Sequence, residues 1–423
     1  MKKKLFLILS IIFILYNPLF AKEEVVLTLE EAIGLALRDN RDILLGAEEV
    51  KKAKLKIAES RANLFPSVSL SGSWTDTRGY YSKDTSQTNA GASAKLYLYR
   101  GGKTINTIKY NGFNLEVATA LLDKAKLETL LQVEKAFHTL LLAREYNELN
   151  KDILENTRGY LEMTVARYAV GEASESDVLM IKESLSNVEG ACEVSLNQVE
   201  SGQALLSNLL FLAQDTEIKP EGEFAYKEKE VAYDEAFLLA MKNRPEIRQY
   251  SAQEEAAKKN VEIARADGRP SIYASWDYYS RSHTASTTGL NKNWNDYNTL
   301  GITFSWPIFD GWATKAKVEQ AIISLKEARL SKEKNIKDIA AELKNAYLDL
   351  KNAIAKIKSA EVQVNLYKDT LSVVAAKYKE GIASSLDLDD AKVSYQVALF
   401  NQKEAIYDYI IAKASFDKAT GGL

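Results

Sequence analysis

The side chains able to do chemistry are few and widely spaced in this sequence. Its single cysteine is Cys192, and its two histidines are His138 and His283. No cysteine and histidine cluster has the spacing of a zinc site, and neither histidine lies beside a serine or cysteine motif typical of a nucleophilic triad. The phosphate-binding motif GxxxxGK[ST] and the dinucleotide-binding motif GxGxxG are both absent. We therefore predict a protein that is not an enzyme and that uses no metal or cofactor.

The residues with the most informative spacing form two short segments that match each other. The sequence ARYAVGEASESDV occupies residues 166–178, and AKYKEGIASSLDL occupies residues 376–388. Both segments share one glycine, one serine and one aspartate at the same spacing: Gly171, Ser174 and Asp177 in the first, Gly381, Ser384 and Asp387 in the second. A glycine just past a helix adopts the left-handed conformation without steric cost, and a serine caps the helix that follows. Each segment therefore predicts a sharp corner between two helices.

The two corners belong to an internal repeat that covers nearly the whole chain. LEEAIGLALRDNRDI at residues 29–43 matches YDEAFLLAMKNRPEI at residues 233–247, and this offset of 204 also relates Pro66 to Pro270. From the glycines that follow the predicted strands onward, the offset is 210. We therefore predict an insertion of six residues in the second copy, between its proline and its glycine.

Each copy has the same order of predicted elements. A first helix, expected to bend or break near Asn40 and Pro245, is stopped by Pro66 or Pro270, because the residue before a proline is biased toward extended geometry. Two strands follow, then a long helix without proline, the corner and a shorter helix. The predicted parts of the chain are a signal peptide at 1–21, a first repeat at 22–212, a linker at 213–231 and a second repeat at 232–423. The first repeat has strands within 66–99, a long helix at 102–170 and a helix at 174–212. The second repeat has strands within 270–308, a long helix at 311–380 and a helix at 384–420.

The long helices have an apolar stripe that recurs in both copies. It lies at Val133, Ala136, Phe137 and Leu140 in the first, and at Leu343, Ala346, Tyr347 and Leu350 in the second. At 1.5 Å per residue, each of these helices would be on the order of 100 Å long. A compact domain has no need of such a helix, so we predict that several chains pack their helices side by side.

The predicted strands, roughly 66–78, 90–99, 270–281 and 297–308, each have one apolar and one polar face. SVSLSGSW at residues 67–74 places Val68, Leu70 and Trp74 opposite four serines, and TLGITFSW at 299–306 has the same alternation. Four strands cannot close a barrel, and an open sheet would leave unpaired edges in a membrane. Two chains would give a barrel filled by side chains, and three chains would give twelve strands around a lumen. Six aromatic residues suit the membrane interfaces: Trp74, Tyr97, Trp276, Tyr278, Trp294 and Trp306.

The N-terminus and the overall charge narrow the location and the partners. MKKKLFLILSIIFILYNPLFA has three lysines, a short apolar core and Ala21 at the predicted cleavage position, which is the pattern of a secretory signal peptide. The net charge of −3 argues against a nucleic-acid binder, which would need a basic face. We therefore predict a secreted protein that does not bind nucleic acid.

The doubled plan with its two glycine corners resembles the TolC-type outer membrane efflux proteins over about residues 25–422. The resemblance implies a mainly α-helical fold with a transmembrane β part. In this fold a homotrimer forms a 12-stranded β-barrel in the lipid of the cell outer membrane, and a long α-helical coiled-coil barrel extends into the periplasm. It also implies an export channel that is joined to an inner-membrane transporter through a periplasmic adaptor, a membrane fusion protein.

Two alternative functions are also considered. A periplasmic adaptor or a structural coiled-coil protein would also have long helical hairpins, but it would not explain the repeated amphipathic strand pairs. A secreted pore-forming toxin would need no corners of the kind that adaptors contact.

The resemblance also implies roles for the residues of the corners. The adaptor-docking positions would be Val170, Gly171, Ala173, Ser174, Gly381, Ala383 and Ser384. The corners would also close the periplasmic end of the tunnel, where Asp387 and Asp390 share a helix face and would form a threefold ring of carboxylates that attracts cations. A bond between Asp177 and Tyr378 would latch this gate. Ala383 stands where the best-known tip network of the family has an arginine, which predicts a weaker or differently built latch.

Overall fold

The computed structural model describes residues 24–80, 83–213, 216–224, 226, 232–285, 293–380 and 382–422. The predicted signal peptide at residues 1–21 lies outside them, as does Gly381. The chain divides into two compact units. Unit 1 comprises Met1–Leu44, Lys126–Leu239 and Glu342–Leu423, and unit 2 comprises Leu45–Ala125 and Ala240–Ala341.

Unit 1 contains both helical corners and a small parallel strand pair. β1 (Glu24–Leu27) pairs with β4 (Glu217–Pro220), and α2 (Leu29–Asp39) follows β1 behind a complete capping box at Thr28. β4 lies inside residues 213–231, for which the sequence predicts only a linker. The pair therefore ties the start of the first repeat to the connection between the repeats.

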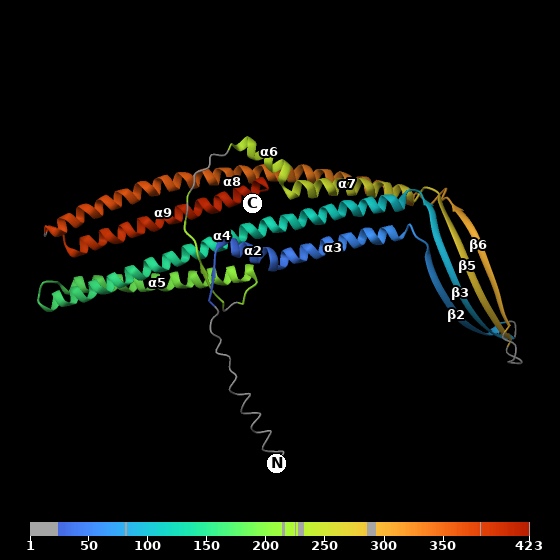
Figure 1. The fold of residues 1–423 in the computed structure, drawn as a ribbon, viewed down its shortest axis with the longest axis horizontal. Coiled ribbons are helices and arrows are strands. Elements are labelled where there is room, and N and C mark those ends of the chain that lie inside the picture. The colour runs from blue at the N-terminus through green and yellow to red at the C-terminus, as the bar shows by residue number, and fades with distance from the viewer. Residues whose placement is uncertain are drawn as a thin grey trace, which may run out of the picture. The chain divides into compact units, whose positions relative to one another are not determined.

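Two long helices run through both units, and each is followed by a corner and a return helix. They are α4 (Lys103–Ala169) with α5 (Glu175–Leu210), and α8 (Ala313–Lys379) with α9 (Ser385–Thr420) (Figure 1). Both long helices have 67 residues, which corresponds to about 100 Å. Among the helices that the structure describes, none combines the length and the apolar composition needed to cross a bilayer.

One apolar core holds the first helical hairpin of unit 1 to its strands. Phe137 and Leu140 of α4 are fully buried, as are Leu206 and Leu210 of α5. Gly202 of α5 lies against this contact, and a Cβ atom there would be 3.4 Å from the Cα atom of Leu140, at the limit of ordinary van der Waals contact. The predicted apolar stripe of α4 is therefore confirmed as its core-facing side. The equivalent stripe of α8 is also buried at Leu343, Ala346 and Leu350.

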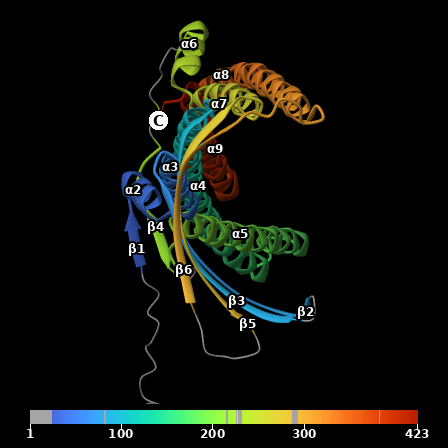
Figure 2. The same cartoon turned by 90° about the vertical axis from the view of Figure 1, so that its right-hand side faces the viewer.

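Unit 2 contains an antiparallel sheet of four strands in the order β2, β3, β5, β6 (Figure 2). The strands are β2 (Ser67–Tyr80), β3 (Lys83–Arg100), β5 (Ser271–Ala285) and β6 (Asn293–Ser305). β3 of the first repeat pairs with β5 of the second, so the two repeats share one sheet. Within the described residues, the outer edges of β2 and β6 have no partner strand.

Two helices lead into this sheet. They are α3 (Arg41–Ala62), which precedes β2, and α7 (Pro245–Ala266), which follows α6 (Tyr233–Asn243) and precedes β5. α2 ends at Asp39 and α3 begins at Arg41, and the same break separates α6 from α7 at Arg244. The predicted breaks near Asn40 and Pro245 are therefore confirmed.

The strands differ from their predicted bounds in both hairpins and at the end of β6. In the second hairpin, β5 ends at Ala285 instead of residue 281, and β6 begins at Asn293 instead of residue 297. The sequence predicts a polar loop between residues 78 and 90, but β3 begins at Lys83, and Ser86 pairs with Asp76. Backbone hydrogen bonds hold an antiparallel ladder whatever the side chains, so the hairpin continues past the last apolar residue. β6 ends at Ser305 instead of continuing to residue 308, because Pro307 has no N–H to donate.

The register confirms that the sheet has an apolar and a polar face. Directly paired residues lie on the same face, and one such row contains Val68, Ala94, Trp276 and Leu300. The next row contains Ser67, Lys95, Ser275 and Gly301. Tyr97 pairs with Tyr273, and therefore lies on the serine face. Its prediction as an interface aromatic together with Trp74 is wrong, because strand pairing decides which face a residue joins.

The repeat is visible in the lengths of the elements. Equivalent helices have 11, 22, 67 and 36 residues in both copies. Ser67 pairs with Lys95, 28 residues later, whereas Ser271 pairs with Ser305, 34 residues later. The six additional residues of the second copy therefore lie inside its β-hairpin.

Candidate docking and gating site

The first corner is a glycine turn between α4 and α5. Gly171 has φ +80°, and its amide donates to the carbonyl oxygen of Tyr168 at 3.0 Å. The amide of Glu172 donates to the carbonyl oxygen of Arg167 at 2.9 Å, which satisfies the end of α4. A Cβ atom on Gly171 would meet nothing within 4 Å. The backbone angle, and not crowding, is therefore what requires a glycine here.

The second corner, between α8 and α9, has the same spacing. The amides of Ile382 and Ala383 both donate to the carbonyl oxygen of Lys377, at 2.9 and 3.3 Å. Figure 1 shows both corners at the same end of unit 1, at the left of the view. The two helical hairpins therefore present their turns in one region.

Both return helices begin with the predicted serine cap. The Ser174 hydroxyl accepts from the amide of Asp177 at 3.2 Å, and Oδ2 of Asp177 accepts from the amide of Ser174 at 2.8 Å. Ser384 and Asp387 make the same two bonds at 3.1 and 2.8 Å. Each cap satisfies two backbone amides that a helix start would leave without a partner.

The caps also lower the pKa of their aspartates. Hydrogen bonds from the backbone amide and the hydroxyl of Ser174 lower the pKa of Asp177. Bonds from the hydroxyl and the backbone amide of Ser384 lower the pKa of Asp387 in the same way. Both aspartates therefore remain ionised at lower pH than an ordinary aspartate.

The pKa of Asp390 is shifted in the opposite direction. Partial loss of hydration raises the pKa of the Asp390 carboxyl, and the nearby carboxylates of Asp387 and Asp389 raise it further. Asp389 is paired with Lys392 at 2.8 Å. Asp390 therefore takes up a proton before Asp387 when the pH falls.

The remaining predicted site residues lie on or near the surface of the corners. Val170, Gly171, Ser174 and Ser384 are exposed, and Ala173 and Ala383 are half-buried. Gly381 lies outside the described residues. Among the hydrogen bonds of the described residues, none joins Asp177 to Tyr378, and the Tyr378 ring is exposed.

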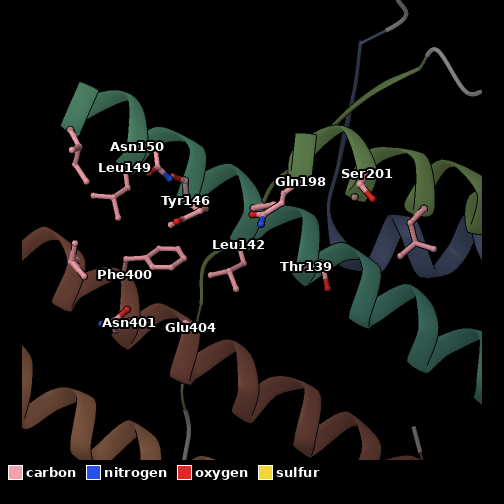
Figure 3. Close-up of a pocket in the computed structure, with 15 residues that line it drawn as sticks. Thr139, Leu142, Tyr146, Leu149, Asn150, Gln198, Ser201, Phe400, Asn401 and Glu404 are labelled. Carbon is pink, nitrogen blue, oxygen red and sulfur yellow. The ribbon is translucent and has the colours of Figure 1, made fainter. Parts of the chain in front are cut away.

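A set of contacts between α4 and α9 was not predicted. The Thr139 hydroxyl lies 2.9 Å from the Tyr407 hydroxyl, and Tyr146 and Phe400 place their ring centres 4.9 Å apart. Figure 3 shows Tyr146 and Phe400 beside a groove of about 730 Å³. The groove also has polar lining residues from three helices, Asn150, Gln198, Ser201, Asn401 and Glu404. No local sequence signal reveals this pairing, because the two helices are far apart in the chain.

The residues with the strongest potential for chemistry do not converge. His138 is buried beside Phe137 and Phe224, and burial lowers its pKa. Cys192 is half-buried and has no disulfide partner. Within the described residues, no group of three histidine, cysteine, aspartate or glutamate side chains could hold a metal ion.

Comparisons with known proteins point to one family. A family model described as "Outer membrane efflux protein" matches residues 32–210 and 238–422. Nodulation protein T of Rhizobium leguminosarum bv. trifolii is 22% identical over 400 residues, which cover 91% of this chain and 83% of that protein. Outer membrane protein TolC of Salmonella enteritidis is 23% identical over 402 residues, which cover 91% of this chain and 80% of that protein. The crystal structure of the outer membrane protein VceC of Vibrio cholerae has a TM-score of 0.75 and 18% identity, and covers 93% of this chain and 96% of that one.

Proposed function

The chain belongs to the outer membrane efflux protein family, and we propose that it is an export channel that docks by its helical corners to a periplasmic adaptor and an inner-membrane transporter. The observation that carries the proposal is the combination, in one chain, of two capped glycine corners and a sheet with an exposed apolar face and two open edges. Members of this family are channel proteins, so we propose no enzyme activity and no cofactor.

The sheet supports assembly from three chains. Leu70 of β2 is 84% exposed, and Ile302 of β6 is 75% exposed, although both are large apolar residues. Unpaired edges and an apolar face are both unfavourable for a chain on its own. Pairing β2 of one chain with β6 of the next would remove the edges and give a 12-stranded barrel with its apolar face toward the lipid.

The location of the channel in the cell follows from the barrel and the long helices. The barrel would lie in the outer membrane, and α4, α5, α8 and α9 would form the periplasmic extension. The signal peptide would direct the chain across the inner membrane and be cleaved after Ala21.

The corners would provide the docking surface for the adaptor. Small side chains and exposed backbone favour a close approach by another helical hairpin. We assign this role to Val170, Gly171, Ala173, Ser174, Gly381, Ala383 and Ser384.

The docking role is tested by changing only the turn geometry. The variant carries Gly171→Pro together with Gly381→Pro. Proline forbids the positive φ of Gly171 and so distorts the first turn, and Gly381→Pro makes the matching change in the second corner. Replacing both glycines by asparagine is the matched control, because asparagine tolerates this conformation. We expect heat-modifiable trimers in the outer membrane with both variants, and loss of export only with proline. Trimers that export normally with proline would disprove docking, and a soluble periplasmic wild-type protein would disprove the channel.

The two helical corners would also form the periplasmic gate of the channel. Asp387 and Asp390 would form a threefold ring of carboxylates at the tip. Since Oδ2 of Asp177 is held by Ser174, a latch to the Tyr378 hydroxyl would use the other carboxylate oxygen, Oδ1. Such a latch would bind the first corner to the second.

The gate is tested by ion selectivity in planar bilayers. Asp390→Asn should lower the preference of the channel for cations, and acidification of the wild type should have the same effect because the pKa of Asp390 is raised. Asp389→Asn is the matched control, since Lys392 already neutralises that carboxylate. An equal effect of both variants would contradict the assignment of Asp390 to the ring.

A further inference from the structure

The polar face of the sheet in unit 2 carries four tyrosines among its serines. Tyr97 of β3 pairs directly with Tyr273 of β5, and Tyr279 of β5 pairs directly with Tyr297 of β6. Side chains alternate between the two faces of a strand, so Tyr273, Ser275 and Tyr279 all lie on this face. A ring gains little apolar contact from serine hydroxyls, so the position of the four rings needs another explanation.

Two cations accompany the first pair of rings. The Nζ atom of Lys95 lies 3.9 Å from the centre of the Tyr273 ring and 4.8 Å from the centre of the Tyr97 ring. The guanidinium carbon of Arg100 lies 4.4 Å from the centre of the Tyr97 ring. The two rings meet edge-on, with their centres 5.7 Å apart. We call these four residues the first aromatic cluster.

The second pair of rings also has a cation beside it. Tyr279 and Tyr297 stack with their ring centres 5.3 Å apart, and they are 39% and 47% exposed. Arg281 lies two residues after Tyr279 on the same strand, and therefore on the same face. We call these three residues the second aromatic cluster. Tyr273 and Tyr279 are six residues apart, which separates the two clusters by about 20 Å along β5.

The cations of both clusters have no acidic partner within the part of the chain that the structure describes. Arg100 donates to the side-chain oxygen of Asn63 at 3.4 Å. Arg281 donates to the side-chain oxygen of Asn89 at 3.0 Å. The ammonium group of Lys95 meets the two tyrosine rings of its cluster. All three cations can therefore pair with an anion that comes from outside the chain.

We propose that the two aromatic clusters are binding sites for planar aromatic anions, such as carboxylated or sulfonated ring compounds, on the path of the exported cargo. The inference rests on the proposed barrel, in which the serine face would line the lumen. An acid group of the ligand would pair with Lys95 or Arg281, while its ring would lie against a tyrosine ring. Assembly of three chains would repeat each cluster three times around the lumen.

The charges and the rings together select this class of ligand. On the described strands, Asp277 is the one acidic residue of the polar face, so the three cations outnumber it and disfavour a cationic ligand. An anion without a ring would use the cations and leave the four tyrosines without a role. A neutral ring compound would use the tyrosines and leave the cations unpaired. An aromatic anion uses both.

The inference is tested by the binding of pyranine, a planar ring system with three sulfonate groups, to purified trimers of the full-length chain in an uncharged detergent. Fluorescence anisotropy gives the dissociation constant. We expect Lys95→Gln with Arg281→Gln to weaken binding about tenfold. Tyr273→Leu with Tyr279→Leu should weaken it to a similar extent. The conservative pair Lys95→Arg with Arg281→Lys should bind nearly as tightly as the wild type.

The controls change the same residue types elsewhere. Lys315→Gln with Arg61→Gln removes two positive charges outside the sheet, and Tyr278→Leu removes a ring from the opposite face of β5. Neither should weaken binding. Equal weakening by these controls, or unchanged binding in the variants of the clusters, would disprove the sites. Citrate, a trivalent anion without a ring, should displace pyranine from the wild-type protein only poorly. Displacement by citrate at pyranine's own concentration would overturn the proposal, even where a variant does not assemble.

A cysteine at Ser93 separates this inference from the proposed barrel. Ser93 lies on the serine face, where its hydroxyl is 2.8 Å from that of Ser69. In a Cys192→Ser background, modification of Ser93→Cys by a membrane-impermeant thiol reagent should lower the channel conductance in planar bilayers. Unchanged conductance would disprove the barrel and this inference with it. Lowered conductance without pyranine binding to the wild-type trimer would disprove the binding sites and leave the channel standing.

Discussion

The helices of the two repeats match each other residue for residue, whereas their β-hairpins do not. All four helix lengths recur, but the second hairpin is six residues longer between its paired ends. In the proposed channel, helices from both repeats form one wall, so a change in one helix would displace its corner from the neighbouring corner. In the same proposal each hairpin would end outside the membrane and would have no such neighbour. The difference indicates that the helix lengths are constrained and the hairpin length is not.

The helix breaks extend the comparison to single residues. Asn40 and Arg244 occupy equivalent positions and have nearly the same backbone angles, φ −62° with ψ 129° and φ −63° with ψ 129°. Asn40 caps α3, since its Oδ1 atom accepts from the amide of Asp42 at 2.9 Å. Arg244 instead forms an almost fully buried ion pair with Glu246 at 2.9 Å. The two repeats thus have the same backbone break, but a different kind of side-chain contact supports it in each.

The largest effect should come from changing the length of one helix. Removing one heptad, residues 354–360, from α8 keeps its apolar stripe in phase but shortens only one of the two long helices. We expect loss of outer-membrane trimers, measured by heat-modifiable electrophoresis. Removing the six residues 286–291 of the second hairpin is the control, and trimers should persist. Trimers with the shortened helix would show that the equal lengths are not required.

The next largest effect should come from the buried ion pair. Arg244→Ala leaves the Glu246 carboxylate buried without its partner, which should lower the free energy of unfolding by about 3–5 kcal/mol. Asn40→Ala, at the equivalent break, should cost only about 1 kcal/mol. Chemical denaturation followed by circular dichroism measures both. Equal costs would mean that the two breaks are supported in the same way.

Loss of either serine cap should have a smaller effect on stability, and the effect should be equal at the two corners. Ser174→Ala and Ser384→Ala each remove one capping bond, and each should cost about 1 kcal/mol of helix stability. Hydrogen exchange at the starts of α5 and α9 measures the change locally. A clearly larger effect at one corner would show that this corner has a further partner.

Acidification should weaken both serine caps and the ion pair between Arg244 and Glu246. The pKa values of Asp177 and Asp387 are lowered by their caps. Burial alone would raise the pKa of Glu246, but the hydrogen bond and the charge of Arg244 hold it below its usual value. Since all three are lowered, their contribution to stability is present above the pKa of the unfolded chain and is lost as the pH falls through the folded values. Stability measured against pH should fall in that acidic range, and less steeply in the Ser174→Ala and Ser384→Ala variants.

The smallest effect on stability should distinguish two aromatic residues that have a positive φ, Phe211 at 58° and Trp312 at 69°. Trp312→Gly removes backbone strain and should raise the free energy of unfolding by about 0.5–1 kcal/mol. Phe211→Gly also removes strain but loses the contact with Arg41, which is worth about 0.5–1 kcal/mol, so its net effect should be near zero. Denaturation midpoints of the two variants provide the test. Destabilisation by Trp312→Gly would show that the Trp312 ring has a structural role.

Much of the fold could be predicted because its signals are local. The glycine and serine of each corner, the prolines before the strands and the alternation of apolar residues act on neighbouring residues. The β1–β4 pair, the α4–α9 contacts and the Arg244–Glu246 pair join distant segments or replace an expected cap. No local pattern specifies such partners, so they were not predicted. The face of the sheet on which Tyr97 lies depends on strand pairing for the same reason.

The order of residues determines where this chain turns, how long each helix is and that the whole plan occurs twice, because backbone preferences and apolar periodicity act over a few residues. Packing decides the rest. It places Tyr97 on the serine face, extends the polar arms of the hairpins through backbone pairing, and leaves Trp312 strained and exposed where Phe211 has a partner. These outcomes depend on atoms that meet only after distant segments have come together.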